Sequence, residues 1–303
     1  MRTPATSLQE RIASGKPILI AEIHPPGSAD PAGLRTAANQ YAGKVHALGV
    51  SDNRDRVAMS ALAAASLLKA EGVETILHVT TRDRNRIALV SEALGAQALG
   101  IRNLLCTSGT HQTLGRYRAA RNVYDIDAVQ LLQTYNDLAN DCGLLGESGL
   151  EGVGPFCLGA VASPDADPPD LQLLRLAKKA RAGATFLVTQ PVHDLARFEA
   201  WWKEVSRRGL NEQVAILAGV QPLSDNAVDP AGPRPPAGIP DPRIVRVASQ
   251  SDPVAFRAAA VKIAVETIHR LANLPGIRGF CLSADGDHET VLRIVEESGL
   301  AGD

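Results

Sequence analysis

The sequence predicts an α/β protein, a (β/α)8 TIM barrel, and three observations support this fold class. Eight apolar runs of strand length recur along the chain, helix-period segments lie between them, and the 303 residues suit one barrel of this kind. We therefore expect residues 1–303 to form a single barrel domain. An open doubly wound sheet is the alternative, but no G-x-G-x-x-G motif follows the first strand.

The predicted strands are near-continuous apolar runs, as expected for strands that are buried on both faces. They span 17–23, 45–51, 74–80, 102–108, 156–162, 184–190, 214–220 and 277–283. The predicted helices span 55–72, 84–100, 125–141, 170–183 and 194–209. Glycine closes several of these helical segments, as at Gly72, Gly183 and Gly209, where it commonly stops a helix.

One segment interrupts the alternation after the seventh strand. Residues 221–243 contain seven prolines in 23 residues, too many for a regular helix. This loop is either a lid or partner-docking element over the active-site face, or a connection without a role of its own.

Composition excludes several classes of protein. The net charge of −2 and the pI near 6.4 give no electrostatic basis for binding nucleic acid or an anionic membrane. No apolar run approaches 18 residues and no signal peptide is recognised, so a cytoplasmic location is expected. The four cysteines, Cys106, Cys142, Cys157 and Cys281, form no C-x-x-C pair, which favours buried free thiols and predicts no metal site.

Polar residues stand at the end of each predicted strand. They are Glu22 and His24, Ser51 to Asn53, His78 and Thr80, Gly109 to His111, Ser163, Gln190, Gln221 and Ser283. In a (β/α)8 barrel these strand ends meet at one face, where catalytic groups collect. Glu22 is notable because it lies within an apolar run and is followed by Pro25 and Pro26. A carboxyl group held there is a candidate acid.

Four stretches together resemble the methylenetetrahydrofolate reductase family. They are "AEIHPPGSAD", "HVTTRDRNRIALVSEALGAQALGIRNLLCTSGTH", "GATFLVTQPVHDLARFE" and "AILAGVQPLSD". Their order and spacing match the family from about residue 16 to 225, and a C-terminal strand and helix complete the barrel. "FCLGAVASPDADP" also resembles a branch that works with a separate iron–sulfur or zinc partner subunit.

The resemblance implies an enzyme that interconverts 5,10-methylenetetrahydrofolate and 5-methyltetrahydrofolate, with FAD as cofactor and NADH as electron donor. In the family, reduced flavin passes hydride to the methylene carbon after the Glu of the first-strand motif, here Glu22, has protonated the folate. The Gln of the T-Q motif, here Gln190, contacts the pterin. We also place Asp52, Gln221 and Thr110 at the substrate.

The residues expected at the flavin are Ser51, His78, Thr80, Gly109, Tyr124, Lys178 and Lys179. The adjacent ammonium groups of Lys178 and Lys179 suit a pyrophosphate, although a solvated basic helix face would contain the same residues.

The chain departs from the family after the fourth strand. Where the family usually has T-G-D, this sequence has Ser108-Gly109-Thr110. Losing a carboxylate beside the flavin should favour an anionic reduced flavin and raise its potential, or else weaken flavin binding.

Three hypotheses follow for the function. The first is the reductase itself, which in this chain could run towards oxidation of methyltetrahydrofolate. The second is a non-catalytic folate- or flavin-binding subunit that depends on a redox partner, and either protein could be a homo-oligomer. The third is an unrelated lyase or aldolase, which the absence of a strand-end lysine disfavours.

Overall fold

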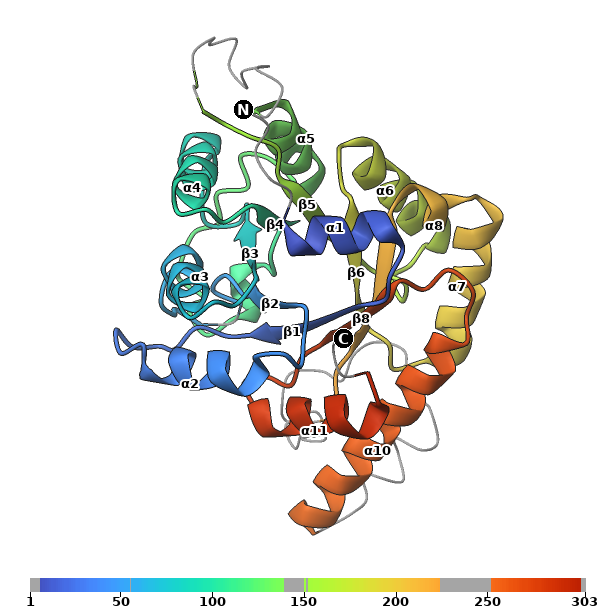
Figure 1. The fold of residues 1–303 in the computed structure, drawn as a ribbon. Coiled ribbons are helices and arrows are strands. Elements are labelled where there is room, and N and C mark those ends of the chain that lie inside the picture. The colour runs from blue at the N-terminus through green and yellow to red at the C-terminus, as the bar shows by residue number, and fades with distance from the viewer. Residues whose placement is uncertain (1–5, 55, 139–149, 151, 224–251, 301–303) are drawn as a thin grey trace.

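The computed structural model describes residues 6–54, 56–138, 150, 152–223 and 252–300. Eight parallel strands pair in chain order, and β1 also pairs with β8, so that the sheet closes into a barrel (Figure 1). The strands are β1 Ile18–Ile23, β2 Ala47–Val50, β3 Thr75–Thr80, β4 Asn103–Thr107, β5 Cys157–Ala162, β6 Phe186–Pro191, β7 Ala215–Val220 and β8 Gly279–Leu282. The predicted (β/α)8 barrel is confirmed, and each strand lies within its predicted range apart from the last residue of β6.

Apart from the first helix, which lies across one end, the helices form a layer around the barrel (Figure 1). They are α1 Ser7–Ser14, α2 Ala32–Tyr41, α3 Ala61–Ala70, α4 Arg86–Ala98, α5 Ala128–Leu138, α6 Pro169–Arg181, α7 Leu195–Arg207, α8 Leu210–Gln213, α10 Pro253–Ala272 and α11 His288–Ser298, with a 3-10 turn at Gln112–Leu114. The five predicted helical segments correspond to α3 to α7. No predicted range covers α1, α2, α8 or α10. None of the helices in the described ranges is long and apolar enough to span a membrane.

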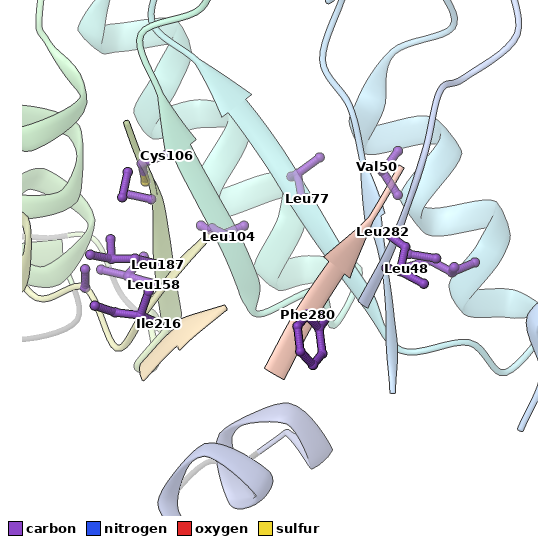
Figure 2. Close-up of a cluster of buried hydrophobic side chains, with 14 of the residues drawn as sticks. Leu48, Val50, Leu77, Leu104, Cys106, Leu158, Leu187, Ile216, Phe280 and Leu282 are labelled. Atoms are coloured by element: carbon purple, nitrogen blue, oxygen red, sulfur yellow. The ribbon is translucent and has the colours of Figure 1, made fainter. Parts of the chain in front are cut away.

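Two apolar clusters hold the barrel together. The larger lies between the strands and the helices, and Figure 2 shows part of it, with labelled side chains from β2 to β8 such as Leu104, Leu158 and Leu282. The smaller lies inside the barrel and includes Ile20, Phe186 and, from α1, Leu8. Helix α1 lies across one end of the barrel, and its Leu8 side chain packs into the cluster inside it (Figure 1). Its N-terminus is closed by a capping box between Thr6 and Gln9, which stabilises so short a helix.

The cysteines that the structure describes are free, as predicted. Cys106, Cys157 and Cys281 are buried, and Cys142 lies outside the described residues. Burial raises the pKa of the Cys157 thiol to about 12, although a hydrogen bond between the thiol and the Thr185 hydroxyl opposes this rise. These thiols therefore stay protonated at neutral pH and serve as core residues.

Gly159 gives a direct test of packing inside the barrel. A Cβ at this position would lie 2.2 Å from the Phe186 ring on the neighbouring strand. We expect Gly159→Ala to lower the free energy of unfolding by about 1–3 kcal/mol, as overpacked core positions do, in urea titrations. Gly33→Ala is the control, because no atom lies within 4 Å of a Cβ there and alanine favours helix α2. Equal stability of the two variants would contradict the packing argument.

Candidate active site

A polar cavity of about 410 Å³ occupies the C-terminal end of the barrel. Apolar side chains such as Ile20, Ile76 and Val188 line its deeper part. Most of the predicted site residues line the same cavity, namely Glu22, Ser51, Asp52, His78, Thr80, Gly109, Thr110, Lys179 and Gln190. Strand ends far apart in the sequence therefore meet here, as the barrel hypothesis requires.

Three predicted residues lie around this cavity and not in its wall. Gln221 lines an adjoining cavity of about 440 Å³, which shares Arg54, Gln190 and Pro191 with the first. Lys178 lines another of about 510 Å³, which shares Ser108, Ala128 and Lys179. Tyr124 is held at the rim, where its hydroxyl donates a hydrogen bond to the Gly109 carbonyl at 3.4 Å. Of the predicted Pro-rich loop 221–243, residues 224–243 lie outside the described residues.

Glu22 reaches the cavity because it continues the inward-facing series of Ile18 and Ile20 along β1. Its side chain is 19% exposed. The nearest basic groups are Arg54 Nη1, at 3.7 Å from Oε1, and the His24 imidazole, whose Nδ1 lies at 3.9 Å. His24 Nδ1 also hydrogen-bonds Ser51 Oγ at 2.6 Å. Both contacts exceed hydrogen-bonding distance, so the carboxyl group can still meet a ligand.

Asp52 also lines the cavity, but its carboxylate is engaged within the protein. Arg84 contacts both oxygens, at 2.5 Å and 3.2 Å, and the Thr80 N–H donates to Oδ2 at 3.0 Å. The Asp52 side chain is only 1% exposed. These bonds join the end of β2 to the end of β3 and the loop that follows it. Asp52 is therefore placed to hold the mouth of the barrel together.

Sequence reasoning missed Arg82 as a structural residue of this site. Its side chain is buried and donates to the Asp83 carboxylate, to the Asn53 carbonyl at 2.7 Å and to the Thr110 carbonyl at 3.1 Å. Arg82 thereby connects the loops after β2, β3 and β4. The sequence feature that could have indicated this role is the high charge density of "TTRDRNR", but a solvent-exposed loop has the same pattern.

Burial alone would raise the pKa of the Asp83 carboxyl. Hydrogen bonds from Arg82 and Gln112, together with the arginine's charge, lower the pKa of that carboxyl below its ordinary value instead. Asp83 therefore stays ionised and keeps Arg82 in place at neutral pH.

Close packing at the strand ends depends on two glycines. Gly109 has φ of +77°, and a Cβ there would lie 2.3 Å from Thr80 Oγ1. At Gly49 a Cβ would lie 2.8 Å from His78 Nε2, so this glycine leaves room for the imidazole in the cavity. Burial lowers the pKa of His78, against the opposing effect of the Glu22 charge, so the imidazole is neutral at neutral pH.

The two predicted lysines occupy different environments on α6. Lys179 lines the barrel cavity, and its Nζ donates to the Val161 carbonyl at 2.6 Å. Burial lowers the pKa of this ammonium group. Lys178 is exposed and, with Arg175 and the apolar Leu171 and Leu174, lines the neighbouring cavity. That cavity combines cationic and apolar side chains, a pattern suited to a nucleotide.

Comparison with known proteins identifies the family. A model of the family described as methylenetetrahydrofolate reductase matches residues 7–299. The chain belongs to the methylenetetrahydrofolate reductase family. The resemblance predicted from the four sequence stretches is thus confirmed.

Among the residues described, no group of three or more His, Cys, Asp or Glu side chains is arranged to hold a metal ion.

Two curated members of the methylenetetrahydrofolate reductase family share part of the sequence. A probable methylenetetrahydrofolate reductase (NADPH) from Caenorhabditis elegans is 26% identical over 171 residues, covering 56% of this chain and 24% of that protein. Methylenetetrahydrofolate reductase 1 of Schizosaccharomyces pombe is 27% identical over 161 residues, covering 50% of this chain and 23% of its own. The matched regions thus span about a quarter of each relative.

A solved structure matches this family member over nearly its whole length. It is an uncharacterized protein from Clostridium thermocellum that binds two copies of 5-methyl-5,6,7,8-tetrahydrofolic acid. The TM-score is 0.69 and the identity 14%, with 96% of this chain and 98% of the other covered. At this identity the match shows a shared fold.

Proposed function

We propose that this protein interconverts 5,10-methylenetetrahydrofolate and 5-methyltetrahydrofolate, with Glu22 as the general acid. The proposal depends on the difference between the two carboxylates that line the barrel cavity in the described ranges. Asp52 is held by Arg84 and the Thr80 N–H, whereas Glu22 has no cation within hydrogen-bonding distance. Glu22 is therefore the carboxyl group that is available to exchange a proton with a ligand.

The chemistry requires a proton before the carbon is reduced. A proton from Glu22 to N10 breaks the bond between N10 and the methylene carbon, and a cationic iminium remains at N5. Hydride addition to that carbon then gives the 5-methyl product. The carboxylate left on Glu22 faces Arg54, whose positive charge favours it. In the reverse direction the same carboxylate accepts the proton.

Gln190 is positioned to orient the folate. It follows Val188 where the pairing of β6 with β7 shifts register, and its side chain lies between the barrel cavity and the adjoining cavity. The neighbouring Thr189 hydroxyl accepts a hydrogen bond from the Gly219 N–H at 2.9 Å, which fixes the backbone there. An amide offers both donors and an acceptor to a pterin edge. Folate binding by the Clostridium thermocellum protein of the same fold also supports this ligand class.

The residues around the barrel cavity and its neighbour offer polar groups for a flavin ring and cationic groups for a pyrophosphate, with the Asp127 carboxylate beside the latter. The barrel cavity joins the basic cavity of Arg175, Lys178 and Lys179 through shared lining residues, so a ring system and a pyrophosphate can be held at once. Ser51, His78, Thr80 and Gly109 would surround the ring. The fit is weakest at Thr110, which provides no carboxylate, and at Lys179, whose ammonium group already binds Val161. When bound, the reduced flavin supplies hydride.

NADH is the electron donor that we propose, bound in the same cavity in turn with folate. Steady-state kinetics with NADH and 5,10-methylenetetrahydrofolate should then give parallel, ping-pong lines and yield 5-methyltetrahydrofolate. Intersecting lines would contradict a shared cavity. If NADH is not oxidised at all, the second candidate is favoured, a folate- or flavin-binding subunit that receives electrons from a partner protein. The cytoplasmic location and a homo-oligomeric state stay predictions.

Substitution of Thr110 tests whether the protein binds FAD and whether this position contacts the flavin ring. We expect the purified protein to show a flavin absorbance spectrum and Thr110→Asp to bind FAD more tightly and with a lower potential, because a carboxylate beside the ring disfavours the anionic reduced form. Thr113→Asp is the control, since it adds the same charge to an exposed position in the same loop. Identical flavin affinity and potential in the two variants would show that position 110 does not contact the ring. Turnover without any flavin would require hydride transfer directly from the nicotinamide.

A further inference from the structure

Arg54 is shared between two carboxylates at the mouth of the barrel. Its Nη1 lies 3.7 Å from Glu22 Oε1 and 3.4 Å from Asp285 Oδ1. His24 lies between the same groups, with Nε2 3.5 Å from Arg54 Nη1 and 3.9 Å from Asp285 Oδ1. The Glu22 side chain faces the cavity, whereas Arg54 and Asp285 are 44% and 52% exposed. A line of charges therefore runs from the cavity to the solvent.

Asp285 is held in place by contacts that do not involve Arg54. Gln221, at the end of β7, donates from Nε2 to Asp285 Oδ2 at 2.8 Å. Asp285 also has φ of +45°, in the left-handed region, which is uncommon for residues other than glycine although Asp adopts it more readily than most. A backbone of this kind persists where surrounding structure holds it. The second oxygen, Oδ1, is thereby directed to Arg54.

We infer that Asp285 is a positioning residue that controls proton donation by Glu22 by drawing the guanidinium of Arg54 towards itself. The inference rests on the proposed function, because it assigns a role to the acid of that reaction. A guanidinium that faced Glu22 alone would favour the carboxylate and oppose donation. Asp285 neutralises part of that charge and so reduces its opposition to proton donation.

The other titratable groups that face Glu22 do not explain the same effect. They are His24 just after β1, His78 on β3, Cys281 on β8 and, beyond His24, His288 on α11. Burial lowers the pKa of His78 and of His288 and raises the pKa of Cys281, so these three groups are neutral at neutral pH. His24 is present in every variant below, and it faces both Glu22 and Asp285.

The direction in which each substitution shifts the pH profile follows from the protonation state of Glu22 that the reaction needs. Reduction requires protonated Glu22, so kcat/KM falls on the alkaline side of the pH profile. In Asp285→Asn the Arg54 charge acts on Glu22 with less opposition, and the alkaline limb should move to lower pH by about half a unit, a modest shift because both partners are partly exposed. Arg54→Gln should move the same limb to higher pH.

A double-mutant cycle tests whether the two residues act together. The kcat/KM profiles of the wild type, Asp285→Asn, Arg54→Gln and the double variant are compared, with Glu289→Gln as the control that removes an exposed charge on α11. The shift caused by Asp285→Asn should shrink once Arg54 is absent, and Asp285→Glu should restore part of the wild-type profile. If Asp285→Asn lowers kcat and thermal stability but leaves the alkaline limb of the kcat/KM profile in place, Asp285 has a merely structural role and the inference is overturned.

A direct titration keeps the inference testable if the enzyme proves inactive. Carboxyl ¹³C NMR of glutamate-labelled protein identifies the Glu22 signal as the one missing in Glu22→Gln. Its titration midpoint should fall in Asp285→Asn and stay unchanged in Glu289→Gln. An unmoved midpoint in Asp285→Asn overturns the inference, whereas a wild type without reductase activity overturns the proposed function instead.

Discussion

Glu22→Gln should lower the rate of 5,10-methylenetetrahydrofolate reduction by about 10²–10⁴-fold, the usual contribution of a general acid. Glutamine keeps the shape of the side chain but has no acidic proton to give to N10. Because Glu22 makes no hydrogen bond that holds the cavity together in the described structure, its loss should leave folate affinity almost unchanged. Single-turnover reduction and equilibrium binding of 5-methyltetrahydrofolate measure the two quantities separately.

The matched control for this substitution is Glu289→Gln, which makes the same chemical change on the exposed surface of α11. It should retain wild-type turnover. Near-wild-type reduction by Glu22→Gln would remove this residue from the mechanism. An equal loss of folate binding and turnover would instead indicate that Glu22 contacts the substrate without acting as an acid.

Asp52→Asn should lower the free energy of unfolding by about 3 kcal/mol, at the lower end for a broken buried ion pair. The substitution removes the direct Asp52 contacts of the partly buried Arg84 guanidinium and leaves it the Glu92 carboxylate at 3.9 Å, while the asparagine oxygen can still accept from the Thr80 N–H. The midpoint of urea denaturation measures this loss. We expect KM for folate to change little in the fraction that remains folded.

Asp125→Asn is the control for that loss, because Asp125 also forms a two-pronged pair with an arginine, Arg86, but at the protein surface. Solvent competes for both partners there, so a much smaller change is expected. The sequence-based prediction that Asp52 contacts the substrate would be supported by the opposite pattern, a raised KM with normal stability. A stability loss with unchanged KM supports the structural role that its bonds to Arg84 indicate.

The fold was predictable because each strand carries its own signal. Strands such as β3 and β7 are covered on both faces, and their apolar runs record this burial directly. Helix α1 shows the limit of this reasoning. Its capping box at Thr6 and Gln9 is visible in the sequence, but eight residues give a weak periodic signal, and its position is set by the inside of the barrel that Leu8 enters.

Much of the candidate site was also predictable, since polar residues at the carboxyl ends of strands must meet at one face of a closed barrel. Glu22, His78 and Gln190 were identified in this way and do line one cavity. Lys178 and Lys179 could not be separated by sequence. Adjacent helical residues point about 100° apart, as follows from 3.6 residues per turn, and only the packing of α6 decides which of the two enters the barrel cavity.

The sequence by itself determined the barrel, the buried free thiols and the position of Glu22, the proposed acid, because each depends on residues close together along the chain. The tertiary structure decided which charges are bound within the protein and which are available. In the sequence Arg82 and Arg84 resemble solvated loop residues and Asp52 was predicted at the substrate, but the loops after β2, β3 and β4 come together and pair these groups within the protein. Arg54 likewise gains its two carboxylates from opposite ends of the chain. Such pairings form only when the barrel closes, since closure brings β1 beside β8 and places their charged ends within a few ångströms of each other.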